Sequence, residues 1–280
     1  MSTPITAALV NDLRKRTDMP MMECKSALQE ADGDIEKAIE IIRMRNSKVS
    51  GKRAMNETAE GRIAVYIDAA KEIATILEMR CESAPVVKSD QFQALCNDIA
   101  KVVADQNPAT VEELIGLKTD AGLTVTDRIN EVIGLIRENM KVQRFARFTG
   151  GSFAEYIHHD GSVGALLQVS GPADAATLRS ICMHITAVQP TPIALNADGV
   201  PAELLAKEKA LAVAKAEATG KPANIAEKIA EGQMKSWLAE NVLLDQQFVI
   251  SPDKTVGQLI QSLGVQASGF ARFKVGEVTV

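Results

Sequence analysis

The chain has 280 residues, 46% of them hydrophobic and 24% charged, so it is long enough to bury a large core and to divide into two or more modules. Its net charge of −5 offers no general attraction to nucleic acid or to an anionic membrane. No run approaches the ~18 consecutive apolar residues of a membrane span, and residues 1–16 have neither the order of a signal peptide nor the composition of a transit peptide. We therefore expect a cytoplasmic protein with no membrane partner and no direct nucleic-acid partner.

Residues that could carry catalysis are sparse. The four cysteines, Cys24, Cys81, Cys96 and Cys182, stand far apart with no CxxC pair, which indicates reduced, buried thiols. The chain has no HExxH, GxSxG or GxGxxG motif, and of its three histidines His184 falls among the core positions of a helix. We predict that the protein is not an enzyme and has no cofactor or metal site. An enzyme that uses Cys81 as a nucleophile is an alternative, although no histidine lies near it in the chain.

Residues 1–45 predict a small domain of three helices. Apolar residues recur every three or four positions in three consecutive stretches, and Gly33 and Asp34 separate the last two as a helix stop and an N-cap. Such a bundle is marginal alone, so we expect a docking module carried by a larger body. Residues 46–60 follow with several lysines and arginines, and we interpret them as a solvated basic linker, a contact to an acidic partner being the alternative.

The body of the chain contains an internal repeat. Residues 61–67, GRIAVYI, and residues 151–157, GSFAEYI, share a glycine, an apolar residue, alanine, tyrosine and isoleucine at identical offsets. Each copy alternates like a half-buried strand and is followed by a second strand and then by a helix. The pattern predicts an α+β core of two related hairpin-plus-helix subdomains, the first over residues 61–145 and the second over residues 146–192 and 241–280.

An Ala-rich segment interrupts the second subdomain. Residues 193–240 contain two long helical patterns separated by glycine and proline, which predicts a projecting antiparallel helical hairpin. After it, the pattern favours a strand near residues 247–250, a helix capped by Thr255, and a final strand that contains Phe270 and Phe273.

The two copies of the repeat differ between the second strand and the helix. Cys96 lies 22 positions after Ala74, whereas Cys182 lies 17 positions after Ala165, so the first copy is longer there. The apolar stretch ESAPVV, residues 82–87, falls inside this insertion, while the second copy closes the same connection with a polar turn. We interpret the insertion as made for a partner. The alternative is that its two valines pack back under the helix.

Residues 13–39, LRKRTDMPMMECKSALQEADGDIEKAI, resemble the N-terminal signature of the elongation factor Ts family, the guanine nucleotide exchange factors for elongation factor Tu. The linker, the duplicated core, the hairpin with GKPANIAEKIAEGQMK, the segment FVISPDKTVGQL and the closing GFARFKVGE follow the family's order to the end of the chain. The resemblance implies a ubiquitin-associated-like N-terminal domain, a core of two subdomains, and a coiled-coil arm that some members use to dimerise, which leaves homodimerisation open. It also implies that the chain binds elongation factor Tu and promotes release of GDP, with displacement of Mg²⁺, so that GTP can rebind during translation elongation.

The resemblance assigns partner contacts to matching positions in two regions. Residues expected to lean on a helix of the GTPase domain are Arg14, Met21, Met22 and Lys25, with Val249 and Ile250 beside them. A contact to another domain of the partner matches His159, or His158 under a shifted alignment of the turn.

The inserted stretch corresponds to the family's loop near the magnesium and phosphate site of the partner. Its residues are Ser83, Ala84, Pro85 and Val86. Many members have a threonine, an aspartate, a phenylalanine and a valine there, so this chain lacks both the carboxylate and the aromatic ring. We hypothesise that the loop still enters the same cleft, with Pro85 giving stiffness and Val86 giving apolar bulk. The altered loop also permits an alternative function, a non-exchanging binding or scaffold protein for a translational GTPase.

Overall fold

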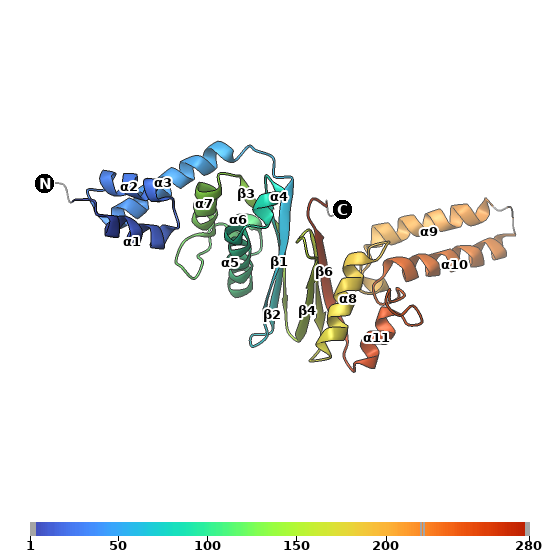
Figure 1. Cartoon of the computed structure of the whole chain (residues 1–280). Helices are drawn as coiled ribbons and strands as arrows, with labels where there is room; N and C mark the ends of the chain where they lie inside the picture. Colours follow the sequence, from blue (N-terminus) through green and yellow to red (C-terminus); the bar gives the residue numbers. More distant parts are fainter. Residues whose placement is uncertain (1–3, 219, 221, 278–280) are drawn as a thin grey trace.

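The computed structural model, which describes residues 4–218, 220 and 222–277, is elongated, with a helical module, a two-sheet core and a helical hairpin following one another (Figure 1). Residues 1–3 and 278–280 of the expected first and last segments lie outside the described residues. The chain combines helices with two three-stranded antiparallel sheets, so the predicted α+β class is confirmed.

Three helices form the N-terminal module: α1 (Ala7–Thr17), α2 (Met21–Glu30) and α3 (Ile35–Arg53). The side chains of Thr6 and Asp34 accept hydrogen bonds from the first turns of α1 and α3 and so fix where these helices begin. Leu13, Cys24 and Leu28 lie at the centre of the module, fully buried.

Helix α3 is longer than the sequence pattern predicts. The prediction of a linker over residues 46–60 is wrong for residues 46–53, because α3 continues to Arg53. Only a short connection then precedes the first strand. The extra turns pack on helix α7 (Val125–Ile136) of the core, where Asn46 is buried against Gly134 and Val49 lies partly buried against the core. This part of α3 looks solvated in the sequence because its buried face is built from a small amide and a facing glycine instead of large apolar residues.

The first sheet has the order β1-β2-β3, with strands β1 (Glu60–Asp68), β2 (Ile73–Cys81) and β3 (Met140–Thr149). Four helices lie between β2 and β3 in the chain: α4 (Ala84–Val87), α5 (Asp90–Gln106), α6 (Val111–Leu114) and α7 (Val125–Ile136). Phe92, Leu95 and Ile99 of α5 are fully buried against one face of this sheet. Because β3 pairs with β2 up to Thr149, the expected subdomain boundary at residues 145/146 falls inside a strand.

The second sheet has the order β4-β5-β6, with strands β4 (Ser152–Ile157), β5 (Val163–Val169) and β6 (Ala267–Lys274). Helices α8 (Ala175–Ala187) and α11 (Val256–Ser262) cover its outer face. Thr255 caps α11 as predicted, in a capping box with Gln258. The strand expected near residues 247–250 does not form, because the chain turns there and only Gln247 makes an isolated pairing, with Thr255.

The inner faces of the two sheets pack on each other, which gives four layers in the order helix, sheet, sheet, helix (Figure 1). Ile63, Ile76 and Leu166 are fully buried in this central layer. The two hairpins have equivalent registers, since Ile67 pairs with Ala74 and Ile157 with Gly164. Gly164, and not Ala165, is therefore the counterpart of Ala74.

The helical hairpin extends from the second-sheet side of the core (Figure 1). After the 3₁₀ turn η1 (Ala197–Gly199), helices α9 (Ala202–Glu217) and α10 (Ala223–Asn241) pack through four buried alanines, Ala212, Ala216, Ala226 and Ala230. Within the described part of the chain, no helix has both the length and the apolar character needed to cross a membrane.

Candidate partner-binding surface

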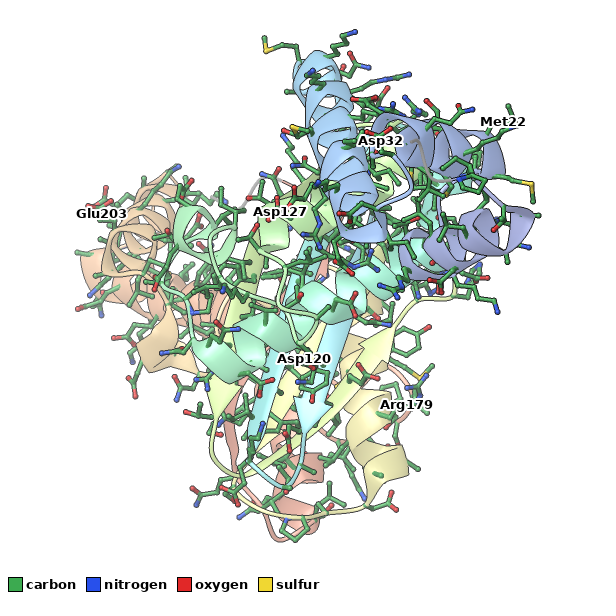
Figure 2. All side chains as sticks on the ribbon, turned by 90° about the vertical axis from the view of Figure 1, so that its left-hand side faces the viewer. Met22, Asp32, Asp120, Asp127, Arg179 and Glu203 are labelled. Atoms are coloured by element: carbon green, nitrogen blue, oxygen red, sulfur yellow. The ribbon has the colours of Figure 1, made fainter. Side chains whose placement is uncertain are left out.

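The first candidate surface is the outer side of the N-terminal module. Met21 and Met22, in the first turn of α2, are 51% and 72% exposed. Arg14 of α1 and Lys25 of α2 are also exposed. Met19, two residues earlier, is fully buried in the module core and anchors the turn that presents them. Figure 2, which looks onto this end of the molecule, shows Met22 at its outer edge. These methionines are therefore surface groups and do not fill the core.

The second candidate surface lies on the second-sheet side. Val249 and Ile250 are 47% and 62% exposed and line a shallow groove of about 380 Å³ together with Tyr156, His158 and Met183. This groove lies against β4, β5 and α8 on the second sheet, whereas α1 and α2, which carry Arg14, Met21, Met22 and Lys25, lie beyond the first sheet (Figure 1). The contact of both groups with one helix of the partner stays a prediction. The sequence does not reveal this separation, since it depends on how the two sheets stack.

The turn between β4 and β5 carries both candidate histidines. His158 is half-buried, its Nδ1 lies 3.1 Å from the Tyr156 hydroxyl, and its ring is 4.3 Å from the ring of the exposed His159. Asp160 holds the turn by accepting from the backbone N–H and the hydroxyl of Ser162, and these bonds lower the pKa of Asp160. His158 faces the groove, whereas His159 is presented to solvent.

The third candidate surface is the short helix α4, which contains most of the inserted stretch. Ala84, Pro85 and Lys88 are exposed, whereas Val86 and Val87 are buried in the core between the first sheet and α5. The hypothesis that Val86 supplies apolar bulk to a partner is therefore wrong. The alternative, in which Val86 and Val87 pack back under the helix, is confirmed. Pro85 lies in the first turn, where its fixed φ suits a helix and its missing N–H costs nothing.

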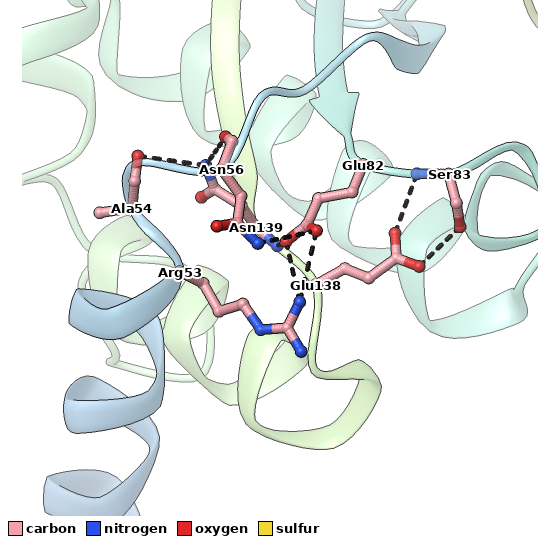
Figure 3. Close-up of polar contacts among 7 residues, drawn as sticks. All are labelled: Arg53, Ala54, Asn56, Glu82, Ser83, Glu138 and Asn139. Atoms are coloured by element: carbon pink, nitrogen blue, oxygen red, sulfur yellow. Dashed lines mark hydrogen bonds and ion pairs between the residues drawn. The ribbon is translucent and has the colours of Figure 1, made fainter.

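Two carboxylates anchor the base of α4 (Figure 3). Glu138 accepts from the backbone N–H of Ser83 at 3.0 Å and from its hydroxyl at 2.6 Å. Glu82 accepts from the backbone N–H of Asn139, from the Asn56 amide at 2.9 Å, and from Arg53 at the end of α3.

Burial alone would raise the pKa of Glu82, but these hydrogen bonds and the Arg53 charge hold it below its usual value. The network ties the start of α4 to the end of α3 and to the segment before β3. Sequence reasoning missed Glu82, Glu138 and Asn139, because their roles depend on contacts between segments more than 50 residues apart in the chain.

Cys81 ends β2 directly before this network. Its thiol is buried, and burial, together with the negative charge of Glu138, raises its pKa to about 12. A thiol with this pKa forms almost no thiolate at neutral pH, so the reading of Cys81 as a nucleophile has no chemical support. Among the residues that the structure describes, no three His, Cys, Asp or Glu side chains are grouped so that they could hold a metal ion.

Comparison with known proteins agrees with the resemblance seen in the sequence. A model of the family Elongation factor TS matches residues 85–277. Elongation factor Ts from Ralstonia nicotianae is 42% identical over 98% of this chain and 91% of that protein. The corresponding proteins of Methylococcus capsulatus and Cupriavidus metallidurans are also 42% identical over 98% of this chain, and the matches cover 92% and 91% of their own lengths. The chain therefore belongs to the elongation factor Ts family.

Proposed function

We propose that the protein is a guanine nucleotide exchange factor that binds elongation factor Tu and promotes release of GDP, with displacement of Mg²⁺, so that GTP can rebind during translation elongation. The observation that carries the proposal is the arrangement of three presented surfaces on one body: the methionines of α2, the Val249–Ile250 groove, and α4 between them along the molecule (Figure 1). Exposed apolar side chains at separate places suit a large partner with more than one domain.

Exchange requires differential binding. By linkage, a factor that weakens nucleotide binding a thousandfold must bind the empty GTPase more tightly than the loaded one by the same ratio, which corresponds to ~4 kcal/mol. The two apolar surfaces contribute affinity for the partner, and α4 contributes the contacts that compete with nucleotide and magnesium. Its anchoring by Glu82 and Glu138 supports this assignment, because a held element loses little conformational freedom on binding.

Because Val86 is buried, the groups that α4 offers to the partner are the Ala84–Pro85 turn and Lys88. We propose that Pro85 forms a stiff apolar front without an inserted ring, and that Lys88 places a positive charge beside it. A larger share of the differential binding then comes from the two outer surfaces than in relatives with an aromatic residue at this place.

The test is stopped-flow release of fluorescent GDP from the cognate elongation factor Tu, with and without this protein. We expect acceleration that rises with the concentration of the protein and saturates. A stable complex without acceleration would favour the non-exchanging scaffold, and the absence of both binding and acceleration would reject each of these functions. The proposal includes a cytoplasmic location and no cofactor, with homodimerisation through the arm as an open question.

A further inference from the structure

A buried histidine lies behind the second candidate surface. His184 of α8 has no exposed surface, and its ring lies 5.8 Å from that of Phe248. Its Nδ1 accepts a hydrogen bond from the backbone N–H of Val249 at 3.3 Å, and its Nε2 lies 3.1 Å from Oε1 of Gln246. The imidazole therefore bridges two points of the segment that carries Val249 and Ile250.

The hydrogen bonds fix the protonation state of this imidazole. A nitrogen that accepts from a backbone N–H carries no proton, so the proton is on Nε2, which donates to Gln246. Gln246 is oriented in turn, since its amide nitrogen donates to the backbone oxygens of Pro190 and Glu240 at 2.9 and 2.7 Å. The neutral ring is also the form that burial favours.

Among the described residues, this segment belongs to no strand and its backbone pairs only through the isolated bridge of Gln247 with Thr255, so it depends on these side-chain bonds. Around the exposed pair, the backbone turns, with Phe248 donating to the carbonyl of Lys254 and Ser251 donating back to Phe248. Phe248 is buried beneath the turn, whereas Val249 and Ile250 project beside the groove. A side-chain acceptor, not a neighbouring strand, therefore holds the N–H of Val249.

We infer that His184, oriented by Gln246, is a positioning residue of the partner-binding surface: it fixes the backbone at Val249 and thereby places the apolar tip of Val249 and Ile250 for elongation factor Tu. The inference rests on the proposed function for the identity of the partner. The positioning itself is a property of the free chain and can be measured without any partner.

The test uses five variants of the full chain, the fifth being His184→Leu combined with the double variant described last. His184→Leu removes both hydrogen bonds, whereas His184→Asn keeps an acceptor oxygen close to the place of Nδ1. Ile185→Ala is the matched control, because it creates a cavity beside the same helix and makes no hydrogen bond to residues 246–250. The double variant Val249→Ala/Ile250→Ala removes the apolar tip itself.

Hydrogen exchange at the Val249 amide is the first measurement, made by NMR on the free protein. We expect about tenfold faster exchange in His184→Leu, the effect of losing one hydrogen bond, and little local change in Ile185→Ala. Affinity for nucleotide-free elongation factor Tu is the second measurement. We expect His184→Leu to lose affinity by about as much as the tip variant, to add little when combined with it, and to be rescued by His184→Asn.

Unchanged exchange at Val249 in His184→Leu would overturn the positioning role. An affinity loss no larger than that of Ile185→Ala, or fully additive with the tip variant, would overturn the link to the partner. Failure of the wild-type chain to bind elongation factor Tu would instead reject the proposed function, and the exchange of Val249 would then decide the positioning role alone.

Discussion

The carboxyl group of Glu155 lies in surroundings that disfavour its ionised form. It lies on β4, its Oε2 is buried without a hydrogen-bond partner, and burial raises its pKa despite the opposing charge of Arg179. An acid with a raised pKa in the folded state binds more protons folded than unfolded. Stability should therefore fall as the pH rises through the unfolded value of 4.5 and then through the folded value.

Glu155→Gln should remove the unfavourable free energy of ionising this buried carboxyl group. We expect the variant to melt a few degrees higher than wild type at pH 7 to 8, with the difference becoming small near pH 4, where the carboxyl group is mostly protonated in both states of the wild type. Thermal unfolding across this pH range measures it, and the exposed Glu112→Gln is the control. A gain that is equal at every pH would indicate an effect of the amide unrelated to ionisation.

Ser83→Ala tests the anchor of α4. The variant removes the hydroxyl that donates to Glu138 at 2.6 Å but leaves the backbone N–H that donates to the same carboxylate. Because the acceptor is charged and partly buried, we expect a loss of about 1–2 kcal/mol in the free energy of unfolding, measured in urea. Ser47→Ala, on the exposed face of α3, should change little, and an equal loss in both variants would contradict a specific anchor.

At the scale of elements, the insertion in the first repeat is helix α4 itself. With the observed register, 22 positions separate Ala74 from Cys96 and 18 separate Gly164 from Cys182, and the difference equals the length of α4. The sequence comparison located this insertion. It did not show which of its residues face the core, because one helical turn is too short to show a period.

Pro85→Gly probes the exposed part of α4. Glycine frees the backbone of this turn, so we expect GDP release to be accelerated about two- to fivefold less than by the wild type, while affinity for nucleotide-free elongation factor Tu stays within twofold. Stopped-flow GDP release measures the first quantity. Val86→Ala is the comparison, since a cavity under α4 should lower stability by about 1–3 kcal/mol. Full exchange activity in Pro85→Gly would remove the turn from the mechanism.

The contact of α3 with α7 depends on a glycine. A Cβ at Gly134 would overlap the amide of Asn46, which is buried and has an unpartnered Nδ2. Gly134→Ala should therefore destabilise the protein by about 1–3 kcal/mol through overpacking, and the double variant Asn46→Ala/Gly134→Ala should recover most of the loss. Urea unfolding of all four proteins completes the cycle, and strictly additive losses would contradict the contact.

At the scale of the whole molecule, the repeat predicts two hairpins with their helices but not how they assemble. Six of the nine residues of β2 are apolar, and the strand is buried over most of its length because both faces of the first sheet are covered. The sequence does not show which surface covers the second face of the first sheet, because tertiary packing decides it. For the same reason the candidate residues could be named individually, while the placement of the Val249–Ile250 groove on the second sheet, away from α2, could not be predicted.

The two ends of the arm are hydrogen-bonded to each other where they join the core, so the core does not need the arm to hold these ends together. Where the chain enters and leaves the arm, Ile193 donates to the carbonyl of Asn241, and Leu243 and Leu244 donate to those of Ala194 and Leu195, each at 2.9–3.1 Å. A separate small cluster, which includes Val200 and Val242, seals this base, and the alanine cluster lies further out along the hairpin. The arm therefore shares little of its buried surface with the two sheets.

Replacing residues 209–234 by a short glycine–serine loop should leave the core intact. We expect the melting temperature to change by about 2 °C or less and GDP release to stay within twofold of the wild type, because the shortened hairpin keeps its sealed base. If the full chain dimerises through the apolar groove between Leu205, Val213 and Met234, sedimentation should show a monomer after shortening. Loss of exchange in a stably folded, monomeric variant would instead make the arm a fourth contact with elongation factor Tu.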